Sequence, residues 1–213
     1  MIPERFCIDY PTRVLQLLEG LAGHAASMDL STTFTLSLAM PMLVIPLERL
    51  KSGHKFSEAK VDSNLHRELY ILMRKKFGET PFWRNDDSRY WRFAYVVKNV
   101  EKLDQWCDVT GAHPLADPPA IQAEDASLEN ILLTLRHALS HGCVVYLDEA
   151  GHERPNRRVT QVAFVSDTRG DHAAPAGSHR IVVVEEQALR RFLIAWCERM
   201  QQFSLSPRLR LAA

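Results

Sequence analysis

The clearest hydrophobic pattern in the chain lies in residues 127–142, SLENILLTLRHALSHG. Its apolar residues recur at steps of three and four positions: Leu128, Ile131, Leu132, Leu135, Ala138 and Leu139. This is the spacing of a helix that buries one face. Asp125 or Ser127 is placed to cap its start, and Gly142 is placed to end it. The pattern therefore predicts a core-facing helix that stops at Gly142.

The opposite side of this predicted helix is unusual. At about 100° per residue it collects mostly polar side chains: Asn130, Leu133, Arg136, His137, Ser140 and His141. A solvated face more commonly carries Glu and Lys. Leu133 would be exposed there unless a second surface packs against it. We therefore expect this side to serve a purpose beyond solvation.

Apolar residues at helical spacing predict further helices over residues 9–27, 57–77, 90–106 and 185–203. The second of these begins at Ser57 as a cap and ends at Gly78. In the third, the sequence YWRFAYVV also fits a strand, and we predict helix. Residues 30–47 contain no charge but include several Ser and Thr residues and two prolines. We predict a central helix that is buried all round and kinked at Pro41 and Pro46, rather than a membrane span.

After His141 the period changes from helical to alternating. Residues 143–147, 159–166 and 180–184 are rich in β-branched side chains and are separated by AGHERPNRR and TRGDHAAPAGS. They predict a small three-stranded antiparallel sheet inserted before the last helix. The predicted fold is mainly α, a single domain over residues 1–213. Its parts are a helical bundle (9–142), a β appendage (143–184), a closing helix (185–203) and a loose tail (204–213).

Composition narrows the classes of function. A length of 213 residues suits one domain, and a formal net charge of +0 gives no global electrostatic attraction to nucleic acid. Any RNA site must therefore be a local patch. The four cysteines form no CxxC pair, and the carboxylate pairs Asp86–Asp87, Glu124–Asp125 and Glu185–Glu186 are isolated from one another, so we expect no metal and no disulfide framework. The first residues, MIPERFCIDY, contain no signal peptide, and we expect a cytoplasmic protein.

Arg136 and His141 are separated by four residues, with His137 directly after the Arg and Gly142 directly after the His. This arrangement resembles the active-site motif of the HEPN superfamily. A second copy of the spacing, Arg49 to His54, is interrupted by residues that end a helix. The proline-interrupted SLAMPMLVIPLERL and the strands after His141 also look like the HEPN branch first named from a plasmid-encoded protein.

The resemblance implies a helical, dimeric, metal-independent ribonuclease that needs no cofactor and serves as a toxin or defence effector. His141 is then the general acid or base, and Arg136 clamps the phosphate through its planar fork. His137 supports them. A two-fold homodimer would unite two motifs and so provide both acid and base. The simpler alternative is that His141 only complements the helix dipole and that Arg136 is solvated.

A second basic cluster occurs in a predicted hairpin turn: His152, Arg154, Arg157 and Arg158. Such turns are commonly just solvated, but this one would also suit RNA-backbone binding by Arg154, Arg157 and Arg158. Cys143 stands where HEPN toxins controlled by nucleotidyltransferase antitoxins often have a modified Tyr. A regulatory or antitoxin partner of another kind remains open. The rival function is a HEPN-like module that binds or assembles without catalysis, and a protein with neither role is the third alternative.

Overall fold

In a computed structural model, the described residues are 6–50, 63–97, 121–155, 157–169, 171 and 174–204. They divide into two compact units. The first contains the chain up to Lys75 and again from Arg190, and the second runs from Lys76 to Leu189. Whether the two units form the single domain predicted over residues 1–213 depends on how they pack together, so that statement stays a prediction. The predicted tail beyond Ser204 lies outside the described residues.

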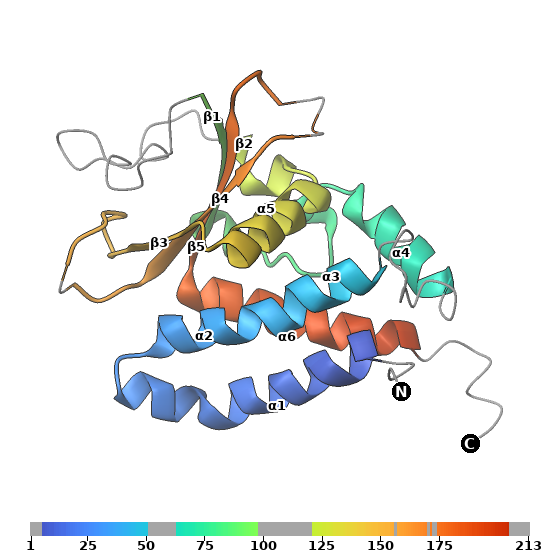
Figure 1. The fold of residues 1–213 in the computed structure, drawn as a ribbon, viewed down its shortest axis with the longest axis horizontal. Helices are drawn as coiled ribbons and strands as arrows, with labels where there is room; N and C mark the ends of the chain where they lie inside the picture. The colour runs from blue at the N-terminus through green and yellow to red at the C-terminus, as the bar shows by residue number, and fades with distance from the viewer. Residues whose placement is uncertain are drawn as a thin grey trace. The chain divides into compact units, whose positions relative to one another are not determined.

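The first unit is helical, as the periodicity predicts. Helix α1 (Phe6–Ser27) packs along α2 (Ser31–Ala39) and α3 (Ile45–Leu50) (Figure 1). Its buried face consists of Val14, Leu15, Leu18, Ala22 and Ala25. The C-terminal part of α6 (Glu186–Ser204) belongs to the same unit, where Gln201 Nε2 donates a hydrogen bond to Thr12 Oγ1 at 3.1 Å. The closing helix predicted over 185–203 is confirmed.

The two prolines in the uncharged segment are accommodated by a change of helix type. A π-helical turn, η1 (Met40–Val44), joins α2 to α3 and contains Pro41. Pro46 has no N–H to donate to the carbonyl four residues earlier, that of Met42. The indole Nε1 of Trp196 donates to this oxygen instead, at 2.9 Å. A side chain of α6 thus supplies the hydrogen bond that the proline removes.

The prediction that this segment is buried all round is wrong. Burial follows one helical stripe: Thr32, Thr35, Ala39, Met42, Leu43 and Pro46. Met40 is 42% exposed. Among the described helices, Ser31–Glu48 alone has the length and apolar composition to cross a membrane, with 39% of this window buried. That is weak support for a span, since a core helix has the same composition.

Helix α4 (Ser63–Met73) ends earlier than predicted, and residues 57–62, with the proposed cap Ser57, lie outside the described residues. The helix ends before Gly78, which sits in a 3-10 turn, η3 (Phe77–Glu79). A Cβ at Gly78 would lie 2.9 Å from the Cβ of Glu124. The glycine is therefore required by close approach to the turn η6 (Ala123–Asp125), and not as a helix stop.

The second unit is built on an antiparallel sheet. The three predicted strands are confirmed as β3 (Val144–Leu147), β4 (Gln161–Asp167) and β5 (His179–Glu185). The sheet is larger than predicted, because β1 (Trp91–Val96) pairs with β5 and the two-residue β2 (Ile121–Gln122) adds to its edge. The order is β2-β1-β5-β4-β3 (Figure 1).

The prediction of a helix over residues 90–106 is wrong where it can be compared. Residues 91–96 form β1, and residues 98–106 lie outside the described residues. Trp91 and Phe93 are buried while Arg92 between them is exposed, which is the alternation of a strand. Register with β5 places Phe93 opposite Val182 and Ala94 opposite Ile181. Cross-strand pairing therefore decides between two local patterns that the sequence allows.

Helix α5 (Leu128–His141) has the predicted caps. Ser127 Oγ accepts a hydrogen bond from the Asn130 amide at 3.2 Å, and Gly142 adopts φ 71°. The helix packs on β4 and β5, within the second unit. The predicted bundle over residues 9–142 draws on both units, so it stays a prediction. The apolar stripe of α5 is buried against a sheet. The same stripe could equally be buried by other helices, so the pattern alone does not say which.

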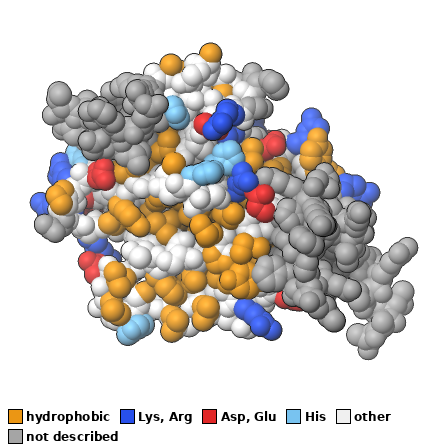
Figure 2. All heavy atoms as spheres, viewed as in Figure 1, with side chains coloured by type: hydrophobic (Ala, Val, Ile, Leu, Met, Phe, Trp, Pro, Cys, Tyr) orange, Lys and Arg blue, Asp and Glu red, His pale blue; other side chains and the backbone are white. Residues whose placement is uncertain are grey.

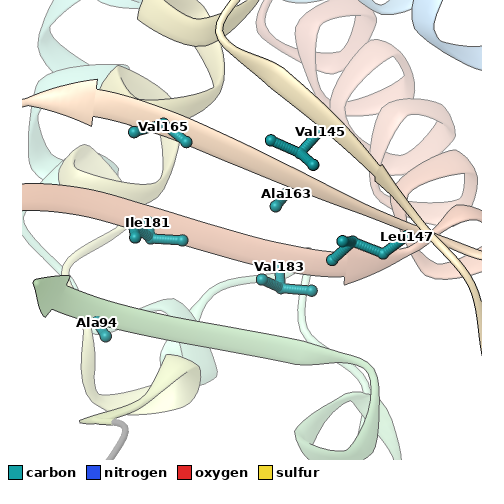
Figure 3. Packing of buried hydrophobic residues seen from close by; sticks show 7 residues of the cluster. All are labelled: Ala94, Val145, Leu147, Ala163, Val165, Ile181 and Val183. Atoms are coloured by element: carbon teal, nitrogen blue, oxygen red, sulfur yellow. The ribbon is translucent and has the colours of Figure 1, made fainter. Parts of the chain in front are cut away.

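The sheet buries apolar side chains on its other face too. Seven residues from four strands lie together there (Figure 3): Ala94, Val145, Leu147, Ala163, Val165, Ile181 and Val183. Arg180 and Ile181 are neighbours in β5, so their side chains point to opposite faces. Arg180 hydrogen-bonds to Asn130 of α5, and the Ile181 cluster is therefore on the face turned away from α5.

Candidate functional site

The predicted motif residues lie in the last turns of α5. Arg136 and His137 are partly exposed, and His141 is exposed. Figure 2 shows histidine side chains over α5, next to Lys or Arg side chains. The imidazoles of His137 and His141 have centroids 6.2 Å apart, with ring planes at 86°. The structure therefore brings two imidazoles and one guanidinium to a single helix end that solvent reaches.

His137 faces an acidic side chain that the sequence analysis did not single out. Its Nδ1 lies 4.0 Å from Oδ1 of Asp167, the last residue of β4. Burial lowers the pKa of His137, and the positive charge of Arg136 lowers it further, while Asp167 acts in the opposite direction. A lowered pKa favours the neutral imidazole near pH 7, which is the form that accepts a proton.

The carboxylate of Asp167 accepts hydrogen bonds from Arg169, whose side chain is exposed. Arg169 Nε donates to Oδ2 at 2.7 Å, and the Arg169 amide donates to Oδ1 at 3.3 Å. Burial alone would raise the pKa of Asp167, but these hydrogen bonds and the Arg169 charge outweigh it, so the pKa is lowered. The carboxylate is therefore negative near neutral pH.

Beneath this surface lies a buried polar network centred on Arg180 of β5, a residue only 2% exposed. Its Nη2 donates to the Asp167 carbonyl at 2.9 Å, and its Nε donates to Ser166 Oγ at 3.3 Å. Its Nη1 is 3.5 Å from Asn130 Oδ1 and 3.8 Å from Asp171 Oδ2. A buried charge is tolerated when it is paired and hydrogen-bonded in this way.

Tyr95 of β1 completes the network. Its hydroxyl donates to Asp171 Oδ2 at 2.9 Å and accepts from Asn130 Nδ2 at 2.8 Å. Burial raises the pKa of Tyr95 to about 12, and the hydrogen bond to Asp171 acts in the same direction. Asn130 was predicted on the open side of the helix, but it is half-buried and turned toward the sheet. It therefore fixes α5 to β1 and β5.

The basic hairpin is not part of this site. It follows β3 at the Gln161 end of β4, whereas Asp167 is at the other end, a separation of about 20 Å at 3.3 Å per residue. The hairpin and Asp167 therefore lie at opposite ends of β4. Arg154 Nη1 is 3.8 Å from the carboxylate of Asp148, which is buried. Arg157 and Arg158 are exposed.

Asp148 explains how the hairpin keeps its shape. Its Oδ1 accepts from the amides of Ala150 at 2.9 Å and His152 at 3.0 Å, and Gly151 takes φ 79°. Arg154 Nη2 also lies 2.6 Å from His152 Nδ1. Part of the basic cluster thus serves the loop itself, and RNA binding by Arg154, Arg157 and Arg158 stays a prediction.

Sequence reasoning missed Asp167, Asp171, Arg180 and Tyr95. One signal was available, since Arg180 is a charged residue next to the β-branched run IVVV of a predicted strand. A charge in a strand buried on both faces requires a partner.

Among the described residues, no group of three or more His, Cys, Asp or Glu side chains is placed to hold a metal ion.

Comparison with known proteins adds no relative. No family model matches the sequence, and no curated protein or solved structure is similar to the chain.

Proposed function

We propose that the chain is a metal-independent endoribonuclease of the HEPN type, with its reactive groups at the C-terminal end of α5. The observation that supports this most is the pair of imidazoles, His137 and His141, 6.2 Å apart on a helix that also carries Arg136. Two imidazoles beside a permanent cation suit acid–base chemistry on a phosphodiester. The exposure of this helix end gives a polyanionic chain access to it.

The proposed reaction uses the RNA as its own nucleophile. A base takes the proton of the 2′-hydroxyl, the 2′-oxygen bonds to phosphorus, and the bond from phosphorus to the 5′-oxygen breaks. An acid gives its proton to that leaving oxygen. Arg136 would stabilise the extra negative charge of the phosphorane by donating two hydrogen bonds. The products are a 2′,3′-cyclic phosphate and a 5′-hydroxyl.

The proposal includes a two-fold homodimer in which two α5 ends meet in one cleft. Such a dimer would double the phosphate clamps and cover Leu133, which is only partly buried within one chain. Light scattering at micromolar concentration would test it. A monomeric mass with full activity would reject the composite site while leaving the chemistry within one chain.

The decisive experiment is incubation of the purified protein with total RNA, with and without EDTA. We expect EDTA to leave the cleavage rate unchanged and the product to carry a 2′,3′-cyclic phosphate. The variant His141→Ala should lower the rate by about 10²–10⁴-fold, the contribution of a positioned acid or base. His24→Ala is the matched control, because His24 is an exposed helical histidine in α1. Metal-dependent cleavage, a 5′-phosphate product, or full activity of folded His141→Ala would reject the mechanism.

A companion pair of variants tests the guanidinium. Arg136→Lys keeps the charge but loses the planar fork, so we expect nearly the same loss as in Arg136→Ala. Arg89→Lys at an exposed position should leave activity unchanged. If the wild-type protein binds RNA and leaves it intact, the non-catalytic binding module is the correct function.

A further inference from the structure

The contact between His137 and Asp167 distinguishes the two histidines of the motif. His141 is exposed, and no ion pair joins it to a carboxylate among the described residues. His137 Nδ1, in contrast, faces the Asp167 carboxylate at 4.0 Å. This separation is too long for a direct hydrogen bond but suits an ion pair or a contact that tightens when substrate binds. The two imidazoles therefore sit in different electrostatic surroundings.

A carboxylate favours one tautomer of the histidine that it faces. At 4.0 Å the negative charge of Asp167 acts on the imidazole through space, and it favours the tautomer that carries its proton on Nδ1. Nε2 is then the ring nitrogen with a free lone pair. The same logic operates wherever a carboxylate orients a catalytic or ligating histidine, and it depends on the carboxylate being held in position.

Asp167 meets that requirement from two directions. Arg169 holds its carboxylate through the side chain and the amide, and Arg180 holds its carbonyl oxygen at 2.9 Å. Arg180 is anchored in turn by Ser166 and by the ion pair with Asp171. The buried hydrogen bonds of Arg180 therefore fix the backbone of Asp167 at the edge of the network.

We propose that Asp167 is a positioning residue that keeps His137 in the Nδ1–H tautomer, and that His137 is the general base of the site. This inference rests on the proposed ribonuclease function. The proton of the 2′-hydroxyl passes to Nε2 of His137 as the 2′-oxygen bonds to phosphorus. The leaving 5′-oxygen takes its proton from His141. Both imidazoles return to their starting states by exchange with water.

The charges around His137 agree with this division of roles. Arg136 and His141 face it from its own helix, Asp167 from β4 and Arg180 from β5. Burial and the two arginines disfavour the imidazolium, so His137 is ready to accept a proton near pH 7. Asp167 opposes them and stabilises the imidazolium that forms during the reaction.

The test combines histidine NMR with RNA cleavage in the full-length protein. Long-range ¹H–¹⁵N spectra report the tautomer and the pKa of His137. We expect the Nδ1–H tautomer in the wild type, and a lower His137 pKa in Asp167→Asn because a favourable negative charge is removed. Asp125→Asn is the matched control, since its carboxylate pairs with exposed Lys76. It should leave the His137 signals unchanged.

Cleavage supplies the second readout. Asp167→Asn should lower kcat/KM by about tenfold or more, a part of what a positioned base contributes. The acidic limb of its pH profile should move to lower pH together with the His137 pKa. Asp167→Glu, which keeps the charge, should recover part of the activity, and this rescue would not follow from a purely structural role.

Several results would overturn the inference. They are an Nε2–H tautomer in the wild type, a His137 pKa that ignores Asp167→Asn, or cleavage that survives His137→Ala in a protein whose His141→Ala variant is inactive. The last result would leave the ribonuclease function standing. If the wild type does not cleave RNA, the proposed function fails and the base role fails with it, while the NMR tautomer still decides whether Asp167 positions His137.

Discussion

Replacing Arg180 by Met should destabilise the second unit far more than any surface substitution. The guanidinium is 2% exposed and donates hydrogen bonds to Asp167, Ser166 and Asn130. It also pairs with Asp171, whose side chain is only 12% exposed. Methionine fills most of the volume but supplies no donor, so the Asp171 carboxylate would stay buried without its cation.

The expected loss follows from these contacts. Removing one member of a buried ion pair costs about 3–5 kcal/mol, because the remaining charge is left uncompensated. For a chain of this size each kcal/mol lowers Tm by about 2–4 °C, so we expect a fall of roughly 6–20 °C. Asp171→Asn should cost less, about 1–3 kcal/mol, since the three hydrogen bonds of Arg180 remain.

Urea unfolding monitored by circular dichroism measures these losses. Arg89→Met, at an exposed position, is the control and should change stability by no more than about 0.5 kcal/mol. The double variant of Arg180 and Asp171 should lose less than the sum of the single variants, because the two residues share one interaction. A loss below about 1 kcal/mol for Arg180→Met would refute the reasoning that the network stabilises the sheet and α5.

Three further predictions concern other parts of the chain. Gly142→Ala should destabilise by about 1–2 kcal/mol at φ 71°, whereas Gly20→Ala, in the interior of α1 with nothing within 4 Å, should stabilise; paired thermal melts check both. Hydrogen bonds from its own loop backbone lower the pKa of Asp148, so its contribution to stability is present above pH about 3.9 and is lost as pH falls through the folded value. Urea titrations from pH 6 to 2 should therefore show a smaller acid loss in Asp148→Asn. Replacing Arg157 and Arg158 by Ser should weaken RNA binding and flatten its salt dependence, and an unchanged salt slope would mark the hairpin as merely solvated.

Local signals were sufficient for several elements. The limits of α5 follow from a side-chain cap at Ser127 and a left-handed glycine at Gly142, both of which act within one turn. The strands β3, β4 and β5 and the last helix also matched their patterns, because turn residues separate them and their periods are unambiguous. The motif residues on α5 were likewise visible, since their spacing depends only on helix geometry.

Other features required tertiary structure. Residues 91–96 carry a pattern compatible with helix or strand, and pairing with β5, almost ninety positions later in the chain, selects the strand. The apolar stripe of α5 predicts that one face is buried, but it does not predict whether helices or a sheet cover that face. In the structure, β4 and β5 cover it.

The composition of the site shows the same division. The sequence by itself placed Arg136, His137 and His141 together, because a helix repeats every 3.6 residues. It could not associate His137 with Asp167, or Asn130 with Tyr95 and Arg180, since those partners lie on separate strands. Strand order and register brought them together, and the low dielectric of the interior made each charge require a partner. Helix geometry therefore set the candidate reactive groups, and the packing of α5 on the sheet decided which groups surround them.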